Sequence, residues 1–391
     1  MKIVIAPDSF KGNLTAMQVA RAIERGIRRV TRGARCVRVP MADGGEGTVQ
    51  SLVDARGGRI IRKRVTGPAG TPVNAFYGLL GDGRTAVIEM AAASGLPLVK
   101  GAARNPMTTT SYGTGELIAD ALDRGATRII LGIGGSATND GGAGMAQALG
   151  VRFFDARRQF IRAYGAGGML DRIARIDMSR VHPKLRAARV VVACDVENTL
   201  CGPKGAAHVF GPQKGATPAM VQRLDRNLRR FAAVIRRDLG MDVLRIRGGG
   251  AAGGLGAGTI AFLGAKLQPG IDIVIDATGL KDHLRDADLV ITGEGRVDAQ
   301  TAFGKTPAGV ARAARRFGVP VIAIGGSLAD DARSVFAHGI AGTASAVARD
   351  MDLEEALRNA PTYIADAAER ALRLVLIGRG LEKRARRHRR K

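Results

Sequence analysis

The sequence has no tryptophan and only 4 tyrosines, so platforms for stacking single-stranded bases are scarce. The three cysteines, Cys36, Cys194 and Cys201, form no C-x-x-C pair, which argues against a disulfide framework and against a zinc site. No run of 18 apolar residues occurs, and the N-terminal MKIVIAPDSF lacks the apolar segment of a signal peptide. We therefore expect a cytoplasmic protein with no membrane partner.

Acidic residues are few relative to basic ones, and the formal net charge is +25. Basic chains gain affinity for nucleic acids by releasing counterions, so a nucleic-acid-binding protein is one alternative. It would need affinity that survives physiological salt after deletion of 381–391, LEKRARRHRRK, which we predict to be a disordered basic tail. Because aromatic residues are scarce, we expect weak nonspecific adhesion and no specific nucleic-acid partner.

Glycine is abundant, with 54 of 391 residues, about twice the usual share of roughly 7%. The length and an apolar content of 46% suffice for two domains. Short apolar segments at Lys2–Ile5 and Cys36–Val39 predict strands, and a polar loop and a helical pattern follow each. Repeated units of this kind predict an α/β fold with a doubly wound parallel sheet, a Rossmann-like domain.

The pattern changes after the second of these units. Strand-like runs at Arg59–Thr66, Pro72–Leu80 and Thr85–Met90 are joined by glycine-containing turns, a meander that indicates a second domain. Later segments predict a long basic helix at Pro218–Leu239 and a strand at Ile271–Asp276.

Residues 287–314 have the strongest signs of a ligand site. Leu289–Ile291 predicts a buried parallel strand, and a polar loop leads to Thr306 and Pro307, the expected N-cap and first residue of a helix. Ligands bind at the carboxyl ends of parallel strands, where helix N-termini favour anions, so we expect phosphate here. Ala299 stands where a Walker A motif needs glycine, so the loop is not a strict P-loop. The loop carries Glu294, Arg296, Asp298, Gln300, Thr301 and Lys305.

A second glycine-rich loop supports a competing interpretation. Gly132, Gly134 and Ala137 satisfy G-x-G-x-x-[GA], and Asp155 ends a later strand near where a dinucleotide fold places its ribose-binding acid. An NAD-dependent oxidoreductase is therefore an alternative. The pattern is weak, because 248–256 supplies another match, and we prefer a phosphate or nucleotide loop.

Acidic residues follow several predicted strands. Phosphoryl transfer needs positioning, charge neutralisation and a base near the acceptor hydroxyl. We favour Asp195 as the base, because it follows a buried strand directly and has no adjacent basic residue. Backbone N–H groups at 134–136, 141–142 and 293–295 are candidates for a phosphate cradle.

The chain resembles the type-1 glycerate kinases of bacteria. The matching stretches lie in the right order between Ala6 and Pro307, and they are APDSFKG, MADGGEGT, NPMTTTSYGTGELI, GIGGSATNDGG, ACDVENTLCGP, GPQKG and TGEGRVDAQTAFGKTP. The resemblance implies ATP-dependent phosphorylation of D-glycerate with Mg²⁺, on the 2-hydroxyl, giving 2-phospho-D-glycerate and ADP. A glycerate 3-kinase, or a kinase of another small hydroxy acid, is the alternative within this class.

The resemblance also implies two α/β domains, one discontinuous and one inserted, with the active site in the cleft between them. We place the Rossmann-like domain at 1–65 plus 285–380 and the inserted domain at 66–284, and we expect a monomer or homodimer. The predicted catalytic residues are Asp8, Lys11, Asp195 and Asp298, and the substrate-binding residues are Ser9, Lys11 and Arg296. ATP or phosphate is assigned to Gly134, Gly135, Ser136, Gly141, Gly142, Gly293, Gly295 and Lys305, and the metal to Asp43, Glu46 and Glu294.

Overall fold

The computed structural model describes residues 1–302 and 304–388, and it divides the chain into two compact units. Unit 1 is discontinuous, Met1–Asp43 with Val274–Lys391, and unit 2 is the inserted segment Gly44–Ile273. The boundaries lie before those predicted, at 65 and 284. The first differs because α2 (Thr48–Arg56) and β3 (Gly58–Thr66) pack in unit 2, where β3 pairs with β4 (Pro72–Leu80) along its whole length.

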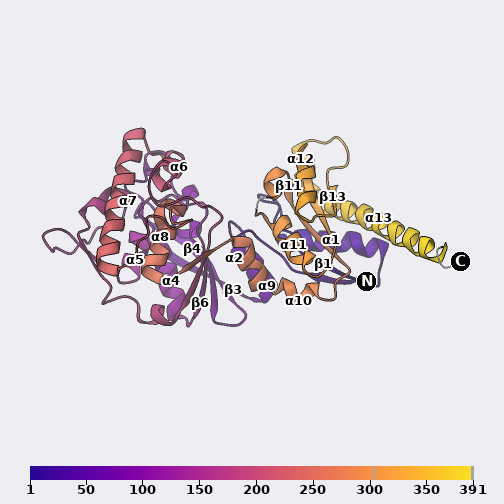
Figure 1. Ribbon diagram of the computed structural model, residues 1–391, viewed down its shortest axis with the longest axis horizontal. Helices are drawn as coiled ribbons and strands as arrows, with labels where there is room; N and C mark the ends of the chain where they lie inside the picture. Colours follow the sequence, from indigo (N-terminus) through magenta and orange to yellow (C-terminus); the bar gives the residue numbers. More distant parts are fainter. Residues whose placement is uncertain (303, 389–391) are drawn as a thin grey trace. The chain divides into compact units, whose positions relative to one another are not determined.

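Unit 1 is built on a parallel sheet of five strands in the order β13–β12–β11–β1–β2. Alternate residues of β1 and β11 point to opposite faces. Ile3, Ile5 and Ile291 form one core with α1 and α13, and α11 packs against β11 and β12; α1 and α13 lie side by side in Figure 1. The strands and helices are β1 Lys2–Ile5, α1 Ala16–Val30, β2 Arg35–Arg38, α10 Leu280–Leu284, β11 Leu289–Val297, α11 Thr306–Arg315, β12 Val321–Leu328, β13 Gly342–Ser345, α12 Leu353–Arg358 and α13 Ala360–His388.

Unit 2 contains a six-stranded sheet in the order β10–β9–β6–β5–β4–β3. The predicted meander is present as the antiparallel neighbours β3, β4 and β5, and the other neighbours pair in parallel. Its further elements are β5 Thr85–Glu89, α3 Ala91–Ser94, α4 Tyr112–Asp123, β6 Arg128–Gly132, α5 Ala143–Ala148, β7 Arg152–Phe154, β8 Arg175–Asp177, β9 Arg189–Ala193, α6 Ala206–Phe210, α7 Pro218–Leu239, α8 Ala251–Leu263 and β10 Lys266–Gln268.

Two predicted segments differ in the structure. Ile271–Asp276 was predicted to be a strand, but it lies within the helix α9, Gly270–Thr278. Its apolar residues are buried, but Asp272 is half-buried and Asp276 is exposed. A run of only six residues is too short for its pattern to separate a strand from a helix. The predicted disordered tail, 381–391, begins inside α13, which continues to His388, and 389–391 lie outside the described residues. Among the described helices, none has the length and apolar character needed to span a bilayer.

The contact between α1 and α13 depends on Gly26. A Cβ atom at Gly26 would lie 2.0 Å from the carbonyl oxygen of Ala365 and 2.9 Å from the Cβ of Ala368. We expect Gly26→Ala to lower the free energy of unfolding by about 1–3 kcal/mol, because the two helices must move apart. Gly378 on α13 has open space around it, so Gly378→Ala is the control and should raise stability by up to about 1 kcal/mol. Urea unfolding followed by circular dichroism measures both, and equal midpoints for the two variants would contradict this account of the packing.

Candidate active site

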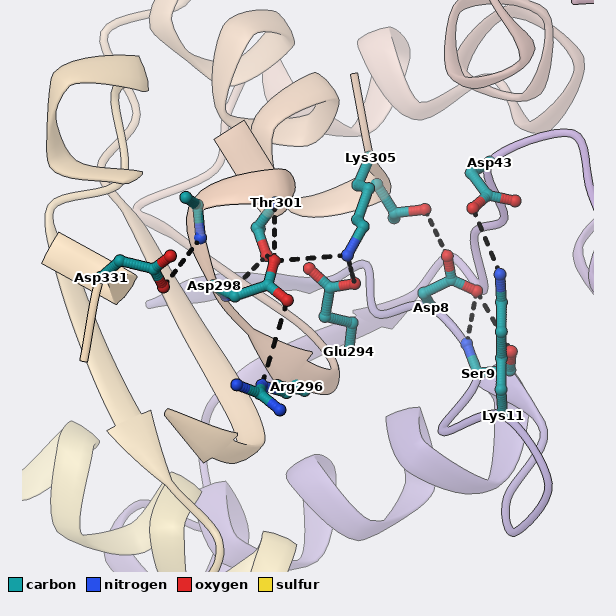
Figure 2. Close-up of polar contacts among 12 residues, drawn as sticks. Asp8, Ser9, Lys11, Asp43, Glu294, Arg296, Asp298, Thr301, Lys305 and Asp331 are labelled. Carbon is teal, nitrogen blue, oxygen red and sulfur yellow. Dashed lines mark hydrogen bonds and ion pairs between the residues drawn. The ribbon is translucent and has the colours of Figure 1, made fainter. Parts of the chain in front are cut away.

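The carboxyl ends of β1 and β11 bring the first polar residues of unit 1 together. The two strands pair in parallel, and the N–H of Asp8 donates to the carbonyl of Gly293 at 2.8 Å just beyond β1. Asp8 is only 5% exposed. Its carboxylate accepts hydrogen bonds from the Thr306 hydroxyl at 2.6 Å and from the Ser9 N–H at 2.6 Å (Figure 2). Asp8 is therefore a buried carboxylate in a fixed orientation.

Burial raises the pKa of Asp8 to about 6, and the neighbouring Asp43 adds to this rise. The hydrogen bonds from Thr306 and Ser9 and the charge of Lys11 act in the opposite direction. The Lys11 side chain is 58% exposed, and its Nζ lies 3.4 Å from Asp43 Oδ2. Partial burial acts to lower the pKa of Lys11, but Asp43 and Asp8 raise it overall, so Lys11 is a stable cation beside Asp8.

The segment after Ile291 continues as a strand, which corrects the predicted loop. β11 pairs with β12 as far as Val297, so Glu294 and Arg296 are strand residues. The start of α11 also differs from the prediction, since Lys305 occupies the N-cap position and Thr306 the first helical one. The Thr306 hydroxyl donates to Asp8 and caps no helix. The sequence around these residues does not reveal that β12 pairs with this segment or that the distant Asp8 accepts the Thr306 hydroxyl.

Four charged side chains converge at the carboxyl end of β11 (Figure 2). Lys305 Nζ lies 3.4 Å from Asp298 Oδ1 and 3.8 Å from Glu294 Oε2. The Arg296 side chain is 68% exposed, and its Nε lies 4.0 Å from Asp298 Oδ2. Arg296 and Lys305 are therefore positive charges placed beside two carboxylates at the end of one strand.

Glu294 and Asp298 have different protonation behaviour although they are neighbours. Burial raises the pKa of Glu294 to about 7, against the opposing effects of Thr301 and Lys305. For Asp298 burial also acts to raise the pKa, but Lys305 and the Thr301 N–H lower it below its usual value. Glu294 Oε1 is buried without a hydrogen-bond partner among the described residues. Carboxylates whose pKa values are pushed apart in this way are typical of acid–base sites.

In unit 2 the loop between β6 and α5 forms a backbone cradle. The N–H groups of Gly134, Gly135 and Ser136 make no hydrogen bond within residues 1–302 and 304–388, and Gly135 has φ = 73°. The turn is fixed by two other bonds, from the N–H of Leu96 to the Gly135 carbonyl at 2.8 Å and from the N–H of Ala137 to Ser94 at 3.0 Å. Three successive free N–H groups with a left-handed residue among them form an anion-binding nest.

The other predicted phosphate glycines differ from this cradle. The N–H of Gly141 donates to the Gly253 carbonyl at 3.0 Å, and that of Gly142 donates to Asp140 Oδ1 at 3.1 Å. These donors are used within the unit, so the free part of the loop stops at Ser136. Gly293 is a buried strand residue whose added Cβ would lie 2.3 Å from the Ile324 carbonyl oxygen, whereas a Cβ at Gly295 would lie 3.8 Å from the Cα of Phe10, an ordinary contact distance.

The sequence profile of the glycerate kinase family matches residues 3–376. The chain belongs to this family. It is 57% identical to the glycerate kinase of Halalkalibacterium halodurans over 94% of this chain and 96% of that protein. It is 52% identical to the glycerate 2-kinase of Escherichia coli over 97% and 99% of the two chains. The crystal structure of a candidate glycerate kinase 2 from Salmonella typhimurium matches with a TM-score of 0.90 and 54% identity, covering 97% of this chain and 99% of that one. The predicted family, α/β fold and kinase class are confirmed.

In this glycerate kinase the predicted catalytic residues are divided between the units. Asp8, Lys11 and Asp298 lie in unit 1, as do Ser9 and Arg296, whereas Asp195 lies in unit 2. Asp195 is exposed, and its Oδ1 accepts the N–H of Gly270 at 2.9 Å at the start of α9.

The predicted metal ligands are divided as well. Asp43 and Glu294 belong to unit 1, and Glu46 is an exposed residue of unit 2. Over the described ranges no three His, Cys, Asp or Glu side chains gather in a group that could hold a metal ion.

Asp155, the acid of the alternative dinucleotide site, stabilises a turn in the structure. Asp155 follows β7, which pairs with β8 in a separate two-stranded sheet, and its carboxylate accepts the N–H groups of Arg157 and Gln159 in the turn. The sequence assigns neither Thr306 nor Lys214 to the site. For Lys214, its place in the GPQKG stretch shared with the resembled family could have drawn attention to it.

Proposed function

We propose that this glycerate kinase is an ATP:D-glycerate phosphotransferase that transfers the γ-phosphoryl group of ATP to the 2-hydroxyl of D-glycerate, giving 2-phospho-D-glycerate and ADP. The names of relatives at 52–57% identity support the substrate, and the Escherichia coli relative is named a glycerate 2-kinase. The observation that carries the chemistry is Asp8, a buried carboxylate at the end of β1 with a cation beside it.

Asp8 is the base that we propose for the acceptor hydroxyl. A base is most effective when its pKa lies near the operating pH, and the pKa of Asp8 is about 6. The carboxylate is held by Thr306 and Ser9, so its orientation costs nothing at the moment of proton transfer. Asp195, the base predicted from the sequence, remains the alternative, but its carboxylate already accepts a helix N–H.

The basic side chains of unit 1 suit the anionic groups of the reactants. Lys11 and Arg296 are largely exposed and are proposed to hold the substrate carboxylate. Lys305, between Glu294 and Asp298, is proposed to contact transferring phosphate oxygens. The free N–H groups of Gly134, Gly135 and Ser136 are proposed to bind other phosphate oxygens of ATP. Each assignment thus pairs a positively charged or N–H hydrogen-bond donor of the protein with a carboxylate or phosphate oxygen of a reactant.

Magnesium is proposed to accompany ATP, with Glu294 as the protein ligand. Mg²⁺ is usually bound by one or two carboxylates together with waters and substrate phosphates, so a cluster of three side chains is not required. The buried Oε1 of Glu294, which has no hydrogen-bond partner in 1–302 and 304–388, fits this demand. When bound, the ion neutralises charge on the phosphate oxygens. Cytoplasmic location and a monomeric or dimeric state stay predictions.

The reaction is tested by incubating the purified chain with Mg-ATP and D-glycerate and recording ³¹P NMR spectra. We expect the signal of 2-phosphoglycerate to appear as ADP forms. A 3-phosphoglycerate signal would keep the kinase but move the acceptor to the 3-hydroxyl. Consumption of ATP only with another hydroxy acid would overturn glycerate as the substrate.

A further inference from the structure

Lys214 is a lysine in the interior of unit 2, with an exposure of 1%. It ends the short helical turn Pro212–Lys214, and this turn is tethered because the Arg104 guanidinium donates to the carbonyl of Gln213. The next residue, Gly215, has φ = 92°, and a Cβ there would lie 2.1 Å from the Arg104 carbonyl oxygen. The backbone that carries Lys214 is therefore closely constrained.

The Lys214 ammonium contacts the end of the loop that carries the free N–H groups. Nζ donates to Ser136 Oγ at 2.6 Å and to the Thr138 carbonyl at 2.6 Å. Lys214 forms no ion pair among the described residues, and the charged group that acts on it is Asp140. Burying an ammonium with only a hydroxyl and a carbonyl as partners is costly. An apolar side chain of similar length would fill the same space at lower cost, which indicates a role for the charge.

The two contacts also determine what the Ser136 hydroxyl can do. Because its oxygen accepts a hydrogen bond from Lys214, its own proton is directed elsewhere. Ser136 follows Gly134 and Gly135, whose N–H groups make no hydrogen bond to the part of the chain that the structure describes, so its hydroxyl proton is available to the same anion. A donor set that is fixed before binding needs little reorganisation when an anion arrives.

The inner side of the loop is fixed in a complementary way. Gly253 has φ = 69°, and a Cβ there would lie 2.0 Å from the Thr138 carbonyl oxygen. The buried carboxylate of Asp140 accepts hydrogen bonds from the N–H and hydroxyl of Ser111 and from the N–H groups of Gly142 and Gly144. Packing against Gly253 and the hydrogen bonds of Asp140 thus hold the loop after Ser136. Lys214 holds the other part of the loop, which carries the free N–H groups, through its bond to Ser136.

We propose that Lys214 is a positioning residue that holds the Gly134–Ser136 turn in its anion-binding shape and orients the Ser136 hydroxyl toward a phosphate group of ATP. This inference rests on the proposed role of the turn in binding ATP. It assigns to the GPQKG stretch a contribution to nucleotide affinity, and it predicts no contact between Lys214 and glycerate.

The pH dependence of nucleotide binding distinguishes this role from a merely structural one. Burial lowers the pKa of Lys214 to about 7, against the charge of Asp140, which is the charged group that acts on it. As the pH rises through 7, the ammonium loses its proton, and the affinity for ATP should fall. An arginine stays charged over this range, so Lys214→Arg should bind ATP with a much flatter pH dependence.

The experiment measures ATP binding directly by isothermal titration calorimetry, together with the KM for ATP and for glycerate. We expect Lys214→Met to weaken ATP binding by about 10- to 100-fold, the loss typical of a charge-assisted hydrogen bond. Ser136→Ala should weaken it by a smaller factor, and the KM for glycerate should stay within about twofold. Lys204→Met is the control, because Lys204 is an exposed lysine of the same segment and should bind ATP like the wild type.

The outcomes separate this proposal from the proposed function. If the wild type binds ATP but phosphorylates no glycerate, the function fails while the binding measurements still test Lys214. Wild-type ATP affinity in Lys214→Met would overturn the proposal. If Lys214→Met fails to fold, the test uses Ser136→Ala and Lys214→Arg instead. The proposal would be overturned if Ser136→Ala bound ATP with wild-type affinity and Lys214→Arg kept the wild-type pH dependence of ATP binding.

Discussion

Asp8→Asn is expected to lower kcat by about 10²- to 10⁴-fold, the usual contribution of a general base. Asparagine has nearly the same shape and keeps an oxygen for the Ser9 N–H, and the Thr306 hydroxyl can rotate to accept from its amide. The variant therefore removes the base with little change in structure. In the wild type, kcat/KM should fall as the pH drops through about 6, where Asp8 becomes protonated, and steady-state rates between pH 5 and 8 measure both effects.

The same variant should be more stable than the wild type at pH 8. The folded-state pKa of Asp8, about 6, lies above its ordinary value of 3.8. The stability from this group is fully present below pH 3.8 and is lost as the pH rises through 6. Ionised Asp8 then costs on the order of 2–3 kcal/mol, which asparagine avoids. Urea unfolding at pH 8 and pH 5 should show a gain for the variant that shrinks at the lower pH.

Asp195→Asn is the comparison that decides between the two candidate bases. Asp195 accepts the N–H of Gly270 at the start of α9, so we expect a modest change in turnover. The opposite order, with full turnover in Asp8→Asn and a collapse in Asp195→Asn, would make Asp195 the base and leave Asp8 as a structural carboxylate.

Helix limits were predictable where the signals are local. α7 runs from Pro218 to Leu239, as expected from the sequence, because both of its ends are encoded by neighbouring residues. Thr217 caps the first turn by accepting the Met220 N–H, and Gly240 adopts the left-handed conformation that ends the helix. The first two strands and the meander were predictable for the same reason, since their turns and apolar runs lie within a few residues of each other.

The parts of the site that escaped prediction depend on distant partners. β11 extends to Val297 because β12 provides a partner for it, although the sequence after Ile291 is polar and rich in glycine. The Thr306 hydroxyl donates a hydrogen bond to Asp8, which lies 298 positions earlier in the chain. Gly141 looked like a phosphate ligand, but its N–H is taken by the carbonyl of Gly253. The sequence shows which residue types follow the strands. Contacts with distant parts of the chain determine which of their hydrogen-bond donors remain free to bind a ligand.

Glu294→Gln is expected to raise the Mg²⁺ concentration needed for half-maximal activity by at least about tenfold. The change keeps the size of the side chain and removes the charge. Burial holds the pKa of Glu294 at about 7, and its Oε1 has no partner among the described residues. A buried carboxylate with an unpaired oxygen is destabilising unless a cation or a proton satisfies it. Glutamine cannot provide the charge that the ion requires, so activity should recover only at high Mg²⁺.

A second readout does not depend on turnover. With ADP present, Mg²⁺ should raise the thermal midpoint of the wild type, because a ligand that binds the folded state stabilises it, and should raise that of Glu294→Gln much less. Glu46→Gln is the matched control, since Glu46 was also predicted to bind the metal but is an exposed residue of unit 2. It should behave as the wild type in both measurements. If Glu294→Gln kept the wild-type Mg²⁺ dependence while Glu46→Gln lost it, the ion would have to be assigned to Glu46, and the unpaired oxygen of Glu294 would then be explained by protonation.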